Sequence, residues 1–154
     1  MSSVETTVEP VRRTVTVNRT VEEAFRVFTE EIGRWWALDM HSLSLERAGA
    51  PAETAFMEGR VGGRLYERMS NGDEADWGKL TAWEPPHRLA FEWYITARPT
   101  QVEVRFTPDG DGTRVELVHS GFERLENADE ARRGYREGWD LGLRRYVEAA
   151  NAAN

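Results

Sequence analysis

One carboxylate in the sequence has neighbours that would make it an acid or base in a pocket. Glu67 lies two residues from both Leu65 and Met69, so the three side chains share one face of a strand over 64–69. We assign this face to the inside of the fold. Desolvation raises the pKa of a carboxyl group and lets it exchange protons with a ligand. The alternative is a register shift at Gly62-Gly63, which would turn Glu67 toward solvent.

Two histidines extend this set of candidates. His119 ends a strand on the inward parity, where its imidazole would either contact a polar ligand group or form structural hydrogen bonds. His41 follows Trp35-Trp36 in a loop that we expect to cover the mouth of a pocket and to contact a ligand. The catalytic candidates are therefore Glu67, His119 and His41, and the sequence leaves open whether the protein is an enzyme.

Several other kinds of catalytic site are absent from the sequence. There is no cysteine, which excludes a disulfide framework, a thiolate zinc site and a cysteine nucleophile. The three histidines show no helical metal-binding spacing, and no serine lies in a nucleophile-elbow context. No glycine-rich phosphate loop follows an expected strand. We therefore expect neither a metal site nor a cofactor.

Aromatic residues are the second feature of chemical interest. Six tryptophans are many for one small core, and each indole N–H requires a partner when it is buried. Core packing is the alternative for each ring taken singly, but together they suit a cavity that holds a planar or hydrophobic molecule. The predicted ligand contacts are Trp35, Trp36, His41, Leu65, Glu67, Phe91, Trp93, Val104, His119, Tyr135 and Trp139.

Strand and helix patterns indicate what positions these residues. Alternation predicts a strand over 11–17, and the capping box at 20–23 begins a helix that runs to about residue 30. A second short helix is expected over 31–36, followed by a loop over 37–53. Alternating segments separated by turn residues then predict about six strands between 54 and 119, joined as an antiparallel meander.

A long helix over about 128–150 closes the chain. It places Tyr135, Gly138 and Gly142 along one line, with Trp139 beside them. Two glycines on one helical face suggest a close approach to the sheet or to a ligand. The alternating sheet must bury its apolar face on this helix, so we predict an α+β fold in which a curved antiparallel sheet wraps the helix and leaves a pocket. One domain is expected over 11–150, preceded by a flexible tail over 1–10.

Charge limits the range of partners. The formal net charge is -7, and acidic residues interrupt each basic cluster, so we expect no nucleic-acid partner. No apolar run reaches the length of a membrane span, and the N-terminus lacks the apolar region of a signal peptide. We expect a cytoplasmic protein that is a monomer or a homodimer.

Short motifs spread along the chain resemble one family. They are Val61-Gly62-Gly63-Arg64, Glu67-Arg68, Trp77-Gly78, Trp83-Glu84-Pro85-Pro86-His87-Arg88-Leu89, Phe106-Thr107-Pro108, Gly112-Thr113-Arg114-Val115, His119-Ser120-Gly121-Phe122 and Gly138-Trp139. The chain is similar here to homologues of the activator of heat-shock protein 90 ATPase, within the START-like (SRPBCC) superfamily. The resemblance covers about 11–148 and implies the helix-grip fold, with two short helices after the first strand and six to seven strands in the sheet.

The resemblance does not choose among functions, because this superfamily includes lipid carriers, hormone receptors, cyclases and hydrolases. Our leading hypothesis is binding of a small hydrophobic or aromatic molecule between sheet and helix. The second is a cyclase, dehydratase or hydrolase that uses the same pocket. The third is a protein-interaction domain that stimulates a chaperone ATPase. It ranks last because the chaperone activators carry an additional N-terminal domain, whereas about ten residues precede the first expected strand.

Overall fold

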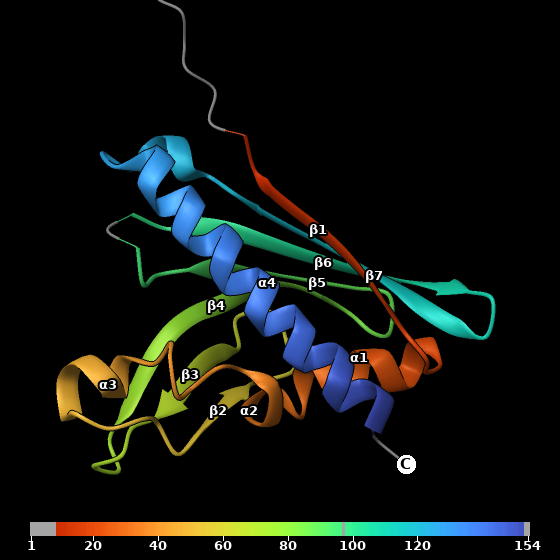
Figure 1. The fold of residues 1–154 in the computed structure, drawn as a ribbon, viewed down its shortest axis with the longest axis horizontal. Helices are drawn as coiled ribbons and strands as arrows, with labels where there is room; N and C mark the ends of the chain where they lie inside the picture. Colours follow the sequence, from red (N-terminus) through yellow and green to blue (C-terminus); the bar gives the residue numbers. More distant parts are fainter. Residues whose placement is uncertain (1–8, 97, 153–154) are drawn as a thin grey trace, which may run out of the picture.

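The computed structural model describes residues 9–96 and 98–152. The strands within them are β1 (Val11–Val17), β2 (Thr54–Met57), β3 (Arg64–Arg68), β4 (Glu74–Glu84), β5 (Arg88–Trp93), β6 (Thr100–Asp109) and β7 (Gly112–Ser120). The helices are α1 (Val21–Thr29), α2 (Ile32–Trp35), α3 (Leu43–Ala48), the 3-10 turn η1 (Phe122–Arg124) and α4 (Ala128–Ala152). The strands form one antiparallel sheet in the order β1-β7-β6-β5-β4-β3-β2, and α4 lies across its curved face (Figure 1). The predicted helix-grip fold is confirmed.

The inner face of the sheet follows the alternation of the sequence. On β6, Val102, Val104 and Phe106 are buried, and β7 buries every second residue in the same way. The register pairs Val104 with Leu117, so two apolar side chains lie opposite each other on the inner face. From β2 to β7 each strand pairs with the next in sequence, which is the predicted meander, and β1 pairs with β7 at the far edge.

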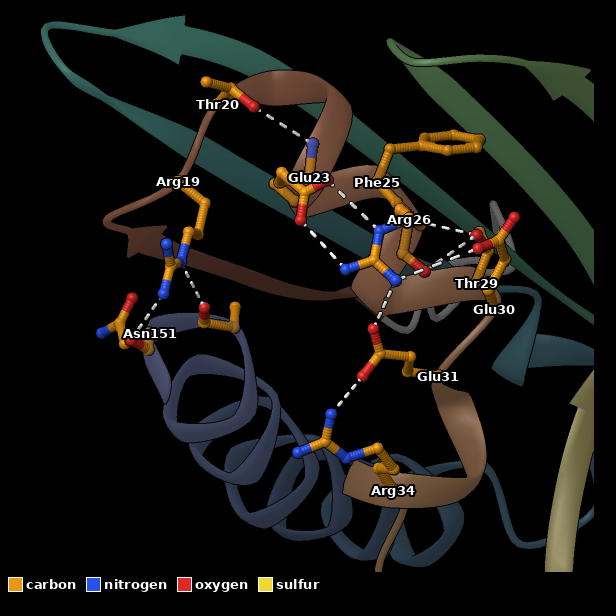
Figure 2. A network of polar contacts seen from close by, with 12 residues as sticks. Arg19, Thr20, Glu23, Phe25, Arg26, Thr29, Glu30, Glu31, Arg34 and Asn151 are labelled. Carbon is orange, nitrogen blue, oxygen red and sulfur yellow. Dashed lines mark hydrogen bonds and ion pairs between the residues drawn. The ribbon is translucent and has the colours of Figure 1, made fainter. Parts of the chain in front are cut away.

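The C-terminal half of α4 is anchored in the core. Leu143, Tyr146 and Ala150 are buried, and the Tyr146 hydroxyl donates to the carbonyl oxygen of Ala24 in α1 at 2.7 Å. At the end of the helix the guanidinium of Arg19 donates to the carbonyls of Ala150 and Asn151, at 2.8 and 3.1 Å (Figure 2). These carbonyls have no partner inside the helix, so the arginine satisfies acceptors that would otherwise need water.

Charged side chains connect α1 to α2 on the outside of the same region. Arg26 donates to Glu23 at 2.9 Å and to Glu31 at 2.6 Å, and Arg34 pairs with Glu31 from the other side (Figure 2). The network is partly exposed, so we expect it to orient the two helices more than to stabilise them.

The segment over 37–53, expected as a loop, contains the helix α3. Ser42 caps its first turn by accepting from the amide of Leu45 at 3.4 Å, and Gly49 follows its end with a φ of 75°. The six-residue helix is too short to show a periodic pattern. Three short helices rather than two therefore lie between β1 and β2.

Residues 1–8 of the predicted N-terminal tail lie outside the described residues. Among the helices described, none combines the length and the apolar character that crossing a bilayer requires.

Replacing Tyr146 with phenylalanine tests the anchoring of α4. The substitution keeps the buried ring and removes one buried hydrogen bond, so we expect the free energy of unfolding to fall by about 1 kcal/mol. Tyr94→Phe, at an exposed tyrosine, is the control and should change it by less than about 0.5 kcal/mol. Equal stabilities of the two variants in urea denaturation would show that the contact with α1 does not hold the helix.

Candidate functional site

A cavity of about 520 Å³ lies beneath the N-terminal half of α4. Its walls come from α4, from the segment over 36–46, which ends within α3, and from the inner faces of β4 and β5. The lining residues are Trp36, Ala37, Met40, His41, Ser42, Leu43, Leu45, Glu46, Trp77, Trp93, Ile95, Asn127, Glu130, Ala131, Gly134, Tyr135, Gly138, Trp139 and Gly142. A volume of this size is typical of small-molecule sites.

Four tryptophans from four separate parts of the chain form an aromatic cluster in this wall: Trp36 directly after α2, Trp77 in β4, Trp93 in β5 and Trp139 in α4. The ring of Trp36 lies 4.8 Å from Trp77, 5.7 Å from Trp93 and 5.4 Å from Trp139, measured between centroids. The contact with Trp139 is edge-on at 88°, and the other two are tilted. Contacts of this kind add to the stability that burial of the rings provides.

Each of these four indoles donates its N–H to another protein group. Trp36 donates to the carbonyl of His41 at 3.2 Å and Trp77 to the carboxylate of Glu67 at 2.7 Å. Trp93 donates to the hydroxyl of Tyr135 at 2.8 Å, and Trp139 donates to Nδ1 of His119 at 3.0 Å. An indole has one donor and no acceptor, so its polar capacity is used. The tryptophans therefore offer a ligand only their apolar surfaces.

Glycines on α4 leave the space that the cavity occupies. A Cβ atom built on Gly134 or Gly138 would meet no atom within 4 Å, and one on Gly142 would meet only the ring of Trp35, at 3.8 Å. Of the two suggested reasons for these glycines, an approach to the sheet or to a ligand, the sheet does not account for Gly138, which faces open space. Each glycine inside a helix costs about 1 kcal/mol relative to alanine, so the open space is maintained against helical propensity.

Glu67 points inward, as its parity predicts, but it does not line the cavity. Its carboxylate is buried and accepts from the backbone amides of Leu43 and Ser44, at 2.7 and 2.9 Å, as well as from Trp77. It thus ties the first turn of α3 to the tryptophan wall. Three donors are bound to this carboxylate, which gives it a positioning role in the described structure.

His119 also lies behind the wall. Because the Trp139 indole can only donate, Nδ1 of His119 must accept, which places the proton of the neutral ring on Nε2. Nε2 then donates to the hydroxyl of Thr100 at 2.8 Å. Burial lowers the pKa of His119 to about 3, so the ring is neutral at physiological pH. Both nitrogens are used within the protein.

His41 is the one catalytic candidate that lines the cavity, and it is exposed to solvent. Glu67 and His119 do not join it there, so the three candidates do not converge on one ligand position. Among the predicted contacts, Trp36, Trp93, Tyr135 and Trp139 also line the cavity. The remainder are buried in the core without lining it: Trp35, Leu65, Phe91 and Val104.

Sequence reasoning missed Trp77 and the residues of α3. Trp77 follows the inward alternation of β4 and was recognisable by that signal, whereas α3 gave none.

The acidic residues Glu46 and Glu130 contribute to the lining, and the described lining residues include no lysine or arginine. Within residues 9–96 and 98–152, no cluster of three metal-ligating side chains occurs.

The family model described as "Activator of Hsp90 ATPase homolog 1-like protein" matches residues 18–149. The chain belongs to this family. No curated protein matches it significantly. The family name refers to the chaperone activators, and an interaction of this member with a chaperone stays a prediction.

Solved structures resemble this member of the family over nearly its whole length. The anthrahydroquino-gamma-pyrone synthase Txn09, solved with SUM, is 31% identical, with a TM-score of 0.65 over 93% of this chain and 97% of the other. The Aha1 dimer from Colwellia psychrerythraea is 16% identical, with a TM-score of 0.67 over 94% and 98%. DynU16 of the dynemicin biosynthetic locus is 21% identical, with a TM-score of 0.64 over 94% of this chain and 48% of the other. The last two show the fold alone.

Glu67→Gln tests the role of the buried carboxylate. The amide keeps the size of the side chain but presents an NH2 group where an oxygen now accepts, so one donor of the trio loses its partner. We expect the free energy of unfolding to fall by about 1–3 kcal/mol. Glu53→Gln, at an exposed position, is the control. A Glu67→Gln protein as stable as this control would contradict the assignment.

The buried imidazole predicts a loss of stability in acid. The unfolded chain protonates His119 near pH 6.5, whereas the folded chain does so only near pH 3, so unfolding takes up a proton between these values. The contribution of His119 to the free energy of unfolding is present in full well above pH 6.5 and declines as the pH falls, by about 1.4 kcal/mol between pH 7.5 and 5.5. Urea denaturation should show that His119→Gln removes this decline, while His87→Gln, at an exposed site, keeps it. The same decline in both variants would rule out His119 as its source.

Proposed function

We propose that this protein binds a small, planar aromatic molecule in the cavity beneath α4. The observation that carries the proposal is the wall of four tryptophans, whose N–H groups are satisfied within the protein and whose rings line about 520 Å³ of space. Apolar walls favour a ligand that is itself apolar, and ring faces favour one with π surface.

Charge narrows the ligand class further. Glu46 and Glu130 line the cavity, and the described lining offers no lysine or arginine to neutralise an anion. A carboxylate or phosphate would lose its hydration there without gaining a cationic partner. The lining therefore favours an uncharged ligand over a fatty acid or a phosphorylated molecule.

The comparison with Txn09 supports the same class. That protein is named as a synthase of an anthrahydroquino-gamma-pyrone, which is a fused aromatic ring system, and it is 31% identical to this chain. We propose that this chain binds the same class of molecule. This class agrees with the wall of tryptophan rings that lines the cavity.

An enzyme acting on such a molecule is the second candidate, and the synthase activity in the name of Txn09 is the observation that favours it. The groups of the cavity wall that can transfer protons include His41, the Tyr135 hydroxyl and the carboxylates of Glu46 and Glu130. Incubation of a bound compound with the protein, followed by chromatography and mass spectrometry, tests this. A product that forms with the protein and not with a His41→Ala, Tyr135→Phe double variant would support catalysis, and unchanged compound would support binding alone.

Filling the cavity from α4 tests the proposed binding. The probe is 2-(hydroxymethyl)anthracene, an uncharged compound of three fused rings, and quenching of tryptophan fluorescence reports its binding. Gly138→Phe should weaken binding at least tenfold, because the new ring projects into space that now holds no atom within 4 Å of its Cβ. Gly138→Ala should keep binding and stabilise the helix by up to about 1 kcal/mol.

The matched control places the same ring on the outer side of the helix. Glu137 is exposed and does not line the cavity, so Glu137→Phe should bind the probe as the unmodified protein does. Equal binding by Gly138→Phe and Glu137→Phe would place the probe elsewhere and refute the proposal.

A further inference from the structure

The hydroxyl of Tyr135 has a hydrogen-bonding capacity that the fold does not use. The indole N–H of Trp93 lies 2.8 Å from it and can only donate, so the hydroxyl oxygen is the acceptor in this pair. The hydroxyl's own proton is then free for a second hydrogen bond. Among residues 9–96 and 98–152, no acceptor for that proton is found. Both residues of the pair line the cavity.

The ring of Tyr135 is fixed by its neighbours. His119 packs against it at 4.9 Å between centroids, Phe122 at 5.9 Å, and Trp93 lies edge-on at 6.1 Å and 88°. With the ring fixed and the oxygen held by Trp93, the direction left for the proton is set before any ligand arrives. Burial raises the pKa of Tyr135, so the hydroxyl keeps its proton and remains a donor at neutral pH.

The other polar side chains of the lining differ in position or in kind. His41 and Ser42 belong to the segment before α3, and Asn127 precedes α4. Glu46 and Glu130 are exposed carboxylates, which accept hydrogen bonds when ionised. His41, Ser42 and Asn127 also carry side-chain donors for which no acceptor is found in the described structure. Tyr135 is the one among these residues whose side chain also accepts a hydrogen bond from a tryptophan of the wall, at 2.8 Å.

We propose that Tyr135 donates a hydrogen bond to a carbonyl oxygen of the bound molecule, which identifies the ligand as an uncharged planar aromatic ketone or quinone. This inference rests on the proposed function, and it adds the chemical group that the cavity selects. A carbonyl fits because its lone pairs lie in the plane of the ring that carries it. A ring stacked along the tryptophan faces presents such an oxygen at its edge.

A matched pair of probes tests this donor. The probes are 2-(hydroxymethyl)anthraquinone and 2-(hydroxymethyl)anthracene, which share their ring framework and substituent and differ in the two carbonyl groups. In Tyr135→Phe the dissociation constant of the quinone should rise about tenfold, since a desolvated carbonyl loses its partner. That of the hydrocarbon should change by less than about twofold. Tyr66→Phe, at a tyrosine outside the cavity, should leave both constants unchanged.

The outcomes separate this inference from the proposal on which it rests. If the unmodified protein binds neither compound, the proposed function and the carbonyl contact both fail. If it binds both and Tyr135→Phe weakens both equally, or weakens neither, the cavity stays a binding site and the contact with Tyr135 is refuted. A selective loss of the quinone supports the inference.

Infrared spectroscopy gives a second measurement that does not require the variant to fold. A hydrogen bond weakens a carbonyl bond, so one carbonyl stretch of the bound quinone should shift to lower wavenumber in the complex with the unmodified protein. A bound quinone whose carbonyl bands match those of the compound in an aprotic solvent would overturn the inference, whatever the behaviour of Tyr135→Phe.

Discussion

The satisfied indole N–H groups are the constraint on which the site depends. An unpaired N–H buried in an apolar wall costs about 1–3 kcal/mol, so each tryptophan is held where its acceptor is. The acceptors come from distant parts of the chain: Glu67 from β3, His119 from β7, Tyr135 from α4 and the His41 carbonyl from the segment before α3. Because every ring is fixed separately, the wall keeps its shape without a ligand.

The helix α4 has two parts with different tasks. Its C-terminal half fills the core with Leu143, Tyr146 and Ala150, and Arg19 satisfies its last carbonyls. Its N-terminal half carries glycines over the cavity and gains little packing from them. A helix anchored at one end can cover an open space at the other, because the packed half supplies the stability that the glycine-bearing half lacks. The cavity thus depends on contacts made several turns away.

Sequence patterns predicted the layout well and the site in part. Alternation identifies the inner faces of β6 and β7, because a side-chain period of two is a local property of a strand. The same parity placed Glu67 and His119 inside the fold. It could not show that the Glu67 carboxylate accepts hydrogen bonds from backbone amides 23 and 24 residues away. Nor could it show that the Trp139 indole donates to His119, 20 residues away. Such contacts depend on the curvature of the sheet and on the path of the segment over 37–53, neither of which follows from a local period.

The distribution of polar groups explains how an apolar cavity could be selective. Burial of aromatic surface stabilises any planar ligand at about 25 cal/mol per Å², with little regard for its substituents. A ligand oxygen placed against a tryptophan face would lose water and gain no donor, because the indole N–H groups are used. Beside the tryptophans, the hydroxyl of Tyr135 compensates that loss. Because the fold uses the indole donors, the hydroxyl of Tyr135 gains influence over which aromatic molecule is bound.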